Sequence, residues 1–345
     1  MVLTKMLKNI VTLIFKNSNL KFHYHKMKRT FIVILLMMCH GLSYGQANKF
    51  FRQANKATDL NEKIELYTKV IELEPKNLDA YFYRGLAKND LGDYSGAIVD
   101  YSKIIVLQPD ADTYYNRGNS RYSLKDYVGA QEDYQNAFKL DPNFIDALYS
   151  LGCVKYDLGD YEGAIKDFTS VIKVIPSQAK TYFLRAAAYS ALEKYPLALN
   201  DYSLAILADP SSDSYYKRGV FYLGINYYEK ANLDLSIALK LNENNSYAYF
   251  YRGTSNLFLG KYMDAVTDFN TALRFDSLDF DALIGLALTY YKINDLNKSK
   301  LYFQKAKAII SPEETIENID QFKNTYWFQN QYFFFNENFK ELSKL

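Results

Sequence analysis

Residues 78–109 read LDAYFYRGLAKNDLGDYSGAIVDYSKIIVLQP, and residues 111–142 read ADTYYNRGNSRYSLKDYVGAQEDYQNAFKLDP. Both stretches carry the string Tyr-x-x-Arg-Gly, then Ala, Asp and Tyr at matching offsets, and both end on Pro. Each has apolar residues at helical spacing in two runs, separated by a short polar loop. One such helical hairpin cannot bury its own apolar face, so neighbouring copies must stack.

The same pattern recurs along most of the chain. Prolines follow one another at intervals of 33 or 34 residues, at Pro75, Pro109, Pro142, Pro176 and Pro210. Seven copies, which we call repeats 1 to 7, start at about residues 78, 111, 145, 179, 212, 246 and 280. A degenerate copy at 46–77 precedes them. The pattern therefore predicts an all-α fold for nearly everything after residue 46.

These copies resemble the tetratricopeptide repeat, a helix–turn–helix unit of 34 residues. The resemblance implies an all-α, right-handed superhelical solenoid. Its parts would be a degenerate repeat at 46–77, seven repeats at 78–311 and a C-terminal capping helical segment at 312–345. We number positions within each repeat from its first residue, so that Gly85 is position 8 and Ala97 is position 20.

Two positions predict how the hairpin is closed. Gly or Ala at position 8 and Ala at position 20 predict a close contact between the first and second helices, for example between Gly118 and Ala130. Asp stands where the second helix needs an N-cap in four repeats, at Asp93, Asp126, Asp160 and Asp295.

Charged residues recur inside the repeats. Position 7 is Arg in five repeats, where the family usually has Leu, and position 23 is Asp in six. We interpret them as partly buried ion pairs within a repeat, because pairing between repeats leaves more charges alone, and a lone buried charge is costly. This arrangement places Asp167 opposite Leu151. The predicted pairs are Arg84–Asp100, Arg117–Asp133, Arg185–Asp201, Arg218–Asp234 and Arg252–Asp268. The alternative is that these arginines bind an anionic ligand.

The resemblance also implies a binding surface. In the family, positions 2, 5, 9, 12 and 13 of the first helices line the concave groove. Position 5 is aromatic in six repeats and is never Lys, which excludes the family's clamp for a C-terminal carboxylate. An aromatic and acidic groove suits an extended peptide with apolar and basic residues. The candidate groove residues are Phe82, Tyr115, Asn119, Tyr149, Tyr156, Phe183, Tyr216 and Phe250. The alternative is that the aromatics only pack between adjacent first helices.

Charge and histidine are both concentrated at the N-terminus. Residues 1–45 hold seven of the 41 Lys and Arg residues and no acid, which leaves 34 basic against 39 acidic residues elsewhere. An acidic body argues against nucleic acid as a partner. All three His also lie in 1–45, and Cys153 is the only Cys after it. With no catalytic triad, nucleotide-binding loop or zinc-site pattern, the sequence predicts a non-enzyme without cofactor or metal.

Residues 27–45 read MKRTFIVILLMMCHGLSYG, which has the pattern of a secretory signal peptide. A basic start precedes an apolar run, and the small residues Ser43 and Gly45 suit cleavage after Gly45. The apolar run is too short to span a bilayer. Because a signal normally begins at the first Met, we interpret residues 1–26 as an upstream extension outside the fold. The alternative is a lipoprotein acylated at Cys39.

An aromatic-rich segment, residues 322–339, lies near the C-terminus. We interpret it as a helix pair that covers the last repeat, and the alternative is a patch for a partner or for self-association. The sequence as a whole predicts a non-catalytic protein-interaction scaffold, exported to a bacterial periplasm or cell envelope. The alternatives are an envelope glycan-binding module that uses the groove aromatics, and a cytoplasmic scaffold that keeps its N-terminus.

Overall fold

The computed structural model describes residue 12, residues 44–310 and residues 318–345. Within those residues every regular element is a helix and none is a strand, which confirms the predicted all-α class. The chain divides into two compact units, one that ends at Gly159 and one that begins at Asp160. Apart from residue 12, the predicted upstream extension lies outside the described residues, as do the signal peptide as far as Ser43 and, within it, Cys39.

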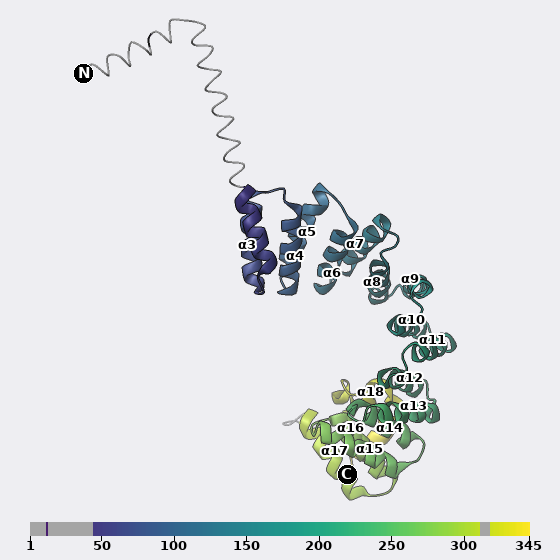
Figure 1. The fold of residues 1–345 in the computed structure, drawn as a ribbon. Coiled ribbons are helices and arrows are strands. Elements are labelled where there is room, and N and C mark those ends of the chain that lie inside the picture. The colour runs from purple at the N-terminus through teal and green to yellow at the C-terminus, as the bar shows by residue number, and fades with distance from the viewer. Residues whose placement is uncertain (1–11, 13–43, 311–317) are drawn as a thin grey trace, which may run out of the picture. The chain divides into compact units, whose positions relative to one another are not determined.

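The N-terminal unit is a row of antiparallel helices (Figure 1). Its helices are residues 44–56, α3 (Leu60–Leu73), α4 (Leu78–Asp90), α5 (Tyr94–Leu107), α6 (Ala111–Ser123), α7 (Tyr127–Leu140) and α8 (Ile145–Asp157). The degenerate repeat at its start has a small core of its own, in which Ala47 and Ala54 cluster with Leu66 and Val70 of α3. It therefore packs as a hairpin in spite of its degenerate sequence.

The C-terminal unit continues the repeats and adds a terminal segment. Its repeat helices are α9 (Tyr161–Val174), α10 (Ala179–Ala191), α11 (Tyr195–Ala208), α12 (Ser212–Gly224), α13 (Tyr228–Leu241), α14 (Ser246–Phe258), α15 (Tyr262–Phe275), α16 (Phe280–Lys292) and α17 (Leu296–Ile310). The terminal segment contains a 3₁₀ turn, η1 (Ile319–Phe322), and the helices α18 (Tyr326–Asn330) and α19 (Tyr332–Leu342). Figure 1 shows α18 beside the repeat helices α12 to α16.

The predicted repeat starts are confirmed. Helices α4, α6, α8, α10, α12, α14 and α16 begin at residues 78, 111, 145, 179, 212, 246 and 280. The predicted caps are confirmed as well, because the carboxylates of Asp93, Asp126 and Asp160 accept from the backbone N–H three residues on. Asp295 accepts from the N–H of Lys298 in the same way. Side-chain caps thus set the start of the second helix in repeats 1, 2, 3 and 7, whereas the second helices of repeats 4, 5 and 6 begin without a side-chain cap.

The glycine at position 8 of repeats 1 and 2 packs against the aromatic ring at position 24. A Cβ added to Gly118 would lie 2.8 Å from Cε1 of Tyr134, and one added to Gly85 would lie 2.7 Å from Cε1 of Tyr101. The nearest group at these two glycines is thus the aromatic ring at position 24, while the predicted Gly118–Ala130 contact stays a prediction. Position 8 of repeats 1 and 2 is glycine where the ring fills the space that a Cβ would take.

Candidate partner-binding face

Five buried ion pairs join the two helices of a repeat. The Nε of Arg84 donates to Asp100 at 2.9 Å and its Nη2 donates to the other carboxylate oxygen at 2.6 Å. The same two-point contact, at distances of 2.6–3.0 Å, forms in Arg117–Asp133, Arg185–Asp201, Arg218–Asp234 and Arg252–Asp268. The structure thus contains all five predicted pairs, each within its own repeat. A two-point Arg–carboxylate contact fixes both distance and orientation.

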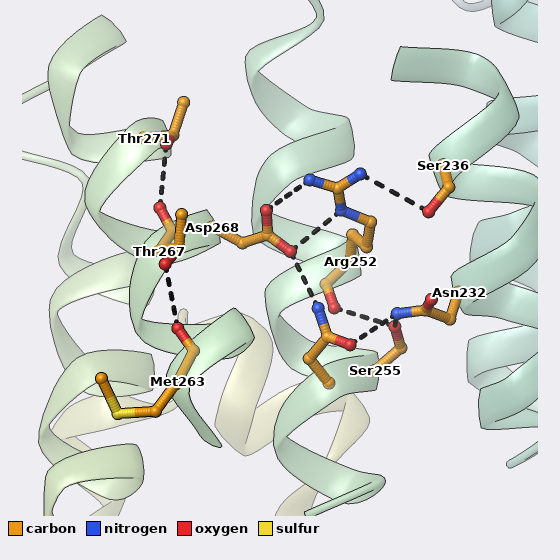
Figure 2. Close-up of polar contacts among 9 residues, drawn as sticks. Asn232, Ser236, Arg252, Ser255, Met263, Thr267, Asp268 and Thr271 are labelled. Carbon is orange, nitrogen blue, oxygen red and sulfur yellow. Dashed lines mark hydrogen bonds and ion pairs between the residues drawn. The ribbon is translucent and has the colours of Figure 1, made fainter. Parts of the chain in front are cut away.

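Each of these arginines also reaches the preceding repeat. Its Nη1 donates to a Ser or Thr hydroxyl, and the acceptors are Thr68, Ser102, Thr169, Ser203 and Ser236. Figure 2 shows this arrangement in repeat 6, where the guanidinium of Arg252 lies between the carboxylate of Asp268 and the hydroxyl of Ser236. The guanidinium has a structural partner on both sides, so the geometry favours a scaffold role over anion binding.

The residue four places after the arginine completes the polar cluster. In repeat 1 the Nζ of Lys88 lies 2.9 Å from Asp100, and in repeat 2 Nη1 of Arg121 lies 3.0 Å from Asp133. In repeat 6 the amide of Asn256 takes this place and donates to Asp268 at 2.9 Å. Sequence reasoning missed this contact, although the spacing of four residues places both groups on one helix face.

The surface that carries position 5 of the first helices, here called the A-helix face, is partly exposed in repeats 1 to 5. The position-5 residues Phe82, Tyr115, Tyr149, Phe183 and Tyr216 are all half-buried. Tyr115 leans on Phe144 with ring centroids 4.8 Å apart, and Phe183 leans on Tyr202 at 5.8 Å. Partial burial raises the pKa of the Tyr149 and Tyr216 phenols. These aromatic side chains are therefore partly packed within the repeats and partly accessible.

Two other predicted groove residues have different surroundings. Asn119 accepts a hydrogen bond from the hydroxyl of the buried Tyr134 at 2.8 Å, so its amide oxygen serves the hairpin core. Tyr156, near the end of α8, is half-buried. In the N-terminal unit the structure thus leaves Phe82, Tyr115 and Tyr149 as the stronger candidates for binding.

Phe250 does not line an open groove, which corrects the prediction for repeat 6. Only 6% of Phe250 is exposed, because Tyr326 and Trp327 of α18 lie on it with ring centroids 5.1 and 6.2 Å away. Ile284, at position 5 of repeat 7, is fully buried as well. The cause is the terminal segment, which the repeat pattern does not contain.

The terminal segment is held by polar as well as aromatic contacts. The backbone N–H of Tyr326 donates to Oδ1 of Asp281 at 2.9 Å, and the indole Nε1–H of Trp327 donates to the carbonyl of Asp281 at 2.8 Å. Trp327 is fully buried. Burial raises the pKa of the Asp281 carboxyl to about 7, and the nearby Asp279 adds to the shift. Residues 318–345 thus cover the A-helix face of repeats 6 and 7, as one of the two interpretations of the aromatic segment expects.

A cavity of about 430 Å³ lies between α11 and α12. Its walls are mostly aromatic and aliphatic, and include Tyr195 and Tyr202 from α11 and Tyr216, Val220 and Phe221 from α12. The ring of Phe221 lies 4.8 Å from that of Tyr202. Lys217 lies at the rim, where its ammonium is 4.8 Å from the ring of Phe183 and pairs with Asp213. A site of this size and composition can receive a large apolar side chain.

Comparison with known proteins agrees with the repeat geometry. Family profiles described as tetratricopeptide repeat match residues 66–99, 111–144, 149–215 and 252–314, together more than half of the chain. The chain belongs to the tetratricopeptide repeat family, and it is accordingly a protein-interaction scaffold.

Solved structures and a curated relative show how far the likeness extends. A tetratricopeptide repeat protein from Parabacteroides merdae has a TM-score of 0.54 at 19% identity, over 71% of this chain and 99% of that one. A MamA structure has a TM-score of 0.45 at 24% identity, over 46% of this chain and 93% of that one. A UDP-N-acetylglucosamine–peptide N-acetylglucosaminyltransferase from Giardia intestinalis is 34% identical over 85 residues, and the chain spans 6% of its length. That fraction is too small to carry an activity over.

No helix in the described part of the chain combines the length and hydropathy of a transmembrane span. No three His, Cys, Asp or Glu side chains in it are grouped closely enough to hold a metal ion.

Proposed function

We propose that the chain binds extended peptide segments of partner proteins on the A-helix face of repeats 1 to 3 in the N-terminal unit and, separately, on that of repeats 4 and 5 in the C-terminal unit. The observation that carries this proposal is that the side chains at position 5 are exposed to different degrees in different repeats. The aromatic residues at position 5 stay half-exposed in repeats 1 to 5, whereas residues 318–345 cover those of repeats 6 and 7. A face that already buries a Tyr and a Trp of its own chain has the chemistry to bury such residues from a partner.

Acidic side chains beside the aromatics add a polar element to the binding face. Position 2 of the first helix is an exposed aspartate in four of the first five repeats, at Asp79, Asp112, Asp146 and Asp213. The equivalent residue of repeat 7, Asp281, accepts a hydrogen bond from a backbone N–H of the terminal segment. The exposed aspartates can accept from a peptide backbone or pair with Lys and Arg of a partner.

The test uses Tyr115 and Tyr149, which stand at position 5 of repeats 2 and 3. We expect a random peptide library to yield binders with aromatic and basic residues, and the double variant Tyr115→Ala, Tyr149→Ala to lose most of their affinity while its melting temperature stays close to wild type. Phe275→Ala removes an exposed aromatic of a second helix and is the matched control. Buried core aromatics would instead cost roughly 3–5 kcal/mol each on truncation. A stable double variant that keeps its peptides, or a chain that selects glycan fragments instead, would contradict the proposal.

We further propose that the protein is exported. The support is the basic start, the apolar run and the small residues Ser43 and Gly45 within residues 27–45. N-terminal sequencing of the native protein is expected to begin directly after Gly45. An intact residue 1 or an acylated Cys39 would contradict the proposal.

A further inference from the structure

Trp327 supplies a template for how this scaffold binds an aromatic side chain. Its ring lies 6.2 Å from Phe250, at position 5 of repeat 6, and 6.3 Å from Phe269, at position 24 of the same repeat. Its Nε1–H donates to the carbonyl of Asp281, at position 2 of the next repeat. The indole is therefore held by one second-helix ring, one first-helix ring and one hydrogen-bond acceptor.

The same three positions recur in repeats 4 and 5. They are occupied by Phe183 at position 5, Tyr202 at position 24 and Asp213 at position 2. Phe183 and Tyr202 lie 5.8 Å apart, close to the 5.9 Å between Phe250 and Phe269. The structural elements that hold Trp327 are thus repeated two repeats earlier.

The two places differ at position 6 of the following repeat, and in repeat 5 the residue at this position lines a cavity. In repeat 7 position 6 is Gly285, and the ring of Phe269 lies where its Cβ would be, 2.6 Å from the Cβ position. In repeat 5 position 6 is Lys217, which carries a long side chain on α12. Phe269 is fully buried, whereas Tyr202 is half-buried and forms a wall of the 430 Å³ cavity between α11 and α12.

We infer that the cavity between α11 and α12 binds a Trp or Tyr side chain of a partner peptide against Tyr202, which stands at the same repeat position as the Phe269 that contacts Trp327. Phe183 and Asp213 are not among the residues that line this cavity. This inference rests on the proposed peptide-binding function and names its ligand chemistry. Phe221 and Tyr202 supply ring faces for the bound side chain, and the ammonium of Lys217 at the rim adds a cation–π contact. A bound Trp must come from a partner peptide rather than from a second copy, because the chain's single Trp is fully buried in its own molecule.

The test uses a labelled peptide with the sequence of residues 321–331, QFKNTYWFQNQ, and the full chain. We expect Gly224→Phe, which projects a ring into the cavity, to weaken binding at least tenfold in fluorescence anisotropy. A Cβ at Gly224 meets no atom within 4 Å, so this variant is expected to keep its fold. Phe221→Ala removes a wall of the cavity and is expected to weaken binding as well. Leu207→Phe adds a ring at an 81% exposed site on α11 and is the matched control.

Three outcomes would overturn the inference. Equal affinity of the peptide for wild type and Gly224→Phe would mean that it binds elsewhere, for example by displacing residues 318–345 from α14 to α16. Unchanged affinity when the Trp of the peptide is replaced by Ala would exclude indole recognition. Concentration-dependent self-association that Gly224→Phe abolishes would make a second copy the occupant. None of these affects the Tyr115 and Tyr149 test, so the two proposals fail separately.

Discussion

The α10–α12 and α14–α16 regions are built from the same repeat positions but present different surfaces. Phe183 is half-exposed beside a cavity, whereas Phe250, at the same position, is covered by Tyr326 and Trp327. Position 6 is Lys217 in one region and Gly285 in the other. A residue's place in the repeat therefore sets which helix face it lies on, while its exposure depends on residues outside the pattern.

The variant with the largest expected effect tests whether the terminal segment causes the difference in exposure between Phe183 and Phe250. Trp327→Ala removes a fully buried indole and its hydrogen bond to Asp281, so we expect a loss of about 3–5 kcal/mol in the stability of the docked segment. Limited proteolysis is expected to cut residues 318–345 first, and urea unfolding gives the magnitude. Phe333→Ala, at an 88% exposed aromatic of the same segment, is expected to change stability by no more than about 0.5 kcal/mol. Similar behaviour of both variants would show that Trp327 is not the anchor.

The next largest effect is the loss of stability expected from substitutions at position 6, which is Gly285 in repeat 7 and Lys217 in repeat 5. Gly285→Ala places a Cβ 2.6 Å from the Phe269 ring, so we expect overpacking to cost about 1–3 kcal/mol. Lys217→Ala, at the same position of repeat 5, removes an exposed side chain and is expected to cost no more than about 0.5 kcal/mol. Chemical unfolding of the two variants measures the difference. Equal costs would mean that position 6 does not distinguish the two regions.

A smaller effect is the pH dependence of docking. Burial raises the pKa of Asp281 to about 7, above its usual value of 3.8, so the docked state holds the proton more tightly than the released state. Docking is therefore expected to be strongest below about pH 4, to weaken as the pH rises to 7, and to level off above it. Trp327 is the only Trp, so its emission maximum measures docking directly.

The control for the pH prediction is Asp281→Asn, which keeps an acceptor oxygen but cannot ionise between pH 4 and 7. We expect its Trp327 emission to be independent of pH over this range. An unchanged pH profile in this variant would assign the titration to another group, such as Asp279.

The smallest effect compares two loops. Glu193, between α10 and α11, has φ +57°, whereas the equivalent loop residue between α14 and α15 is Gly260 with φ +73°. A side chain in this left-handed region costs roughly 1–2 kcal/mol, so Glu193→Gly is expected to raise stability by up to about 1 kcal/mol after the extra flexibility of glycine is counted. Thermal unfolding measures this, and a decrease in melting temperature would show that the strain is relieved in another way.

The periodic part of the structure was the part that the sequence could predict. Helix starts, N-caps and the five Arg–Asp pairs repeat every 33 or 34 residues, so each copy supports the others. The contact of Gly118 with the ring of Tyr134 was not predicted, because spacing places positions 20 and 24 on the same helix face and does not tell which side chain lies nearer. The burial of Phe250 could not be predicted, because its partners lie some 76 residues later in a segment without repeats.

The hydrogen bonds of the five arginines make the repeat a modular part. Each guanidinium is neutralised by the aspartate of its own repeat and joins a Ser or Thr at one fixed place in the repeat before it, as Arg252 joins Ser236 and Arg218 joins Ser203. Repeats 1, 3, 4 and 5 carry that hydroxyl at position 25, whereas repeats 2 and 6 have Gln135 and Asn270 there. An arginine-bearing hairpin inserted after one of the four repeats with the hydroxyl would therefore meet the same acceptor, so the array can lengthen by whole hairpins at those places with the junction kept.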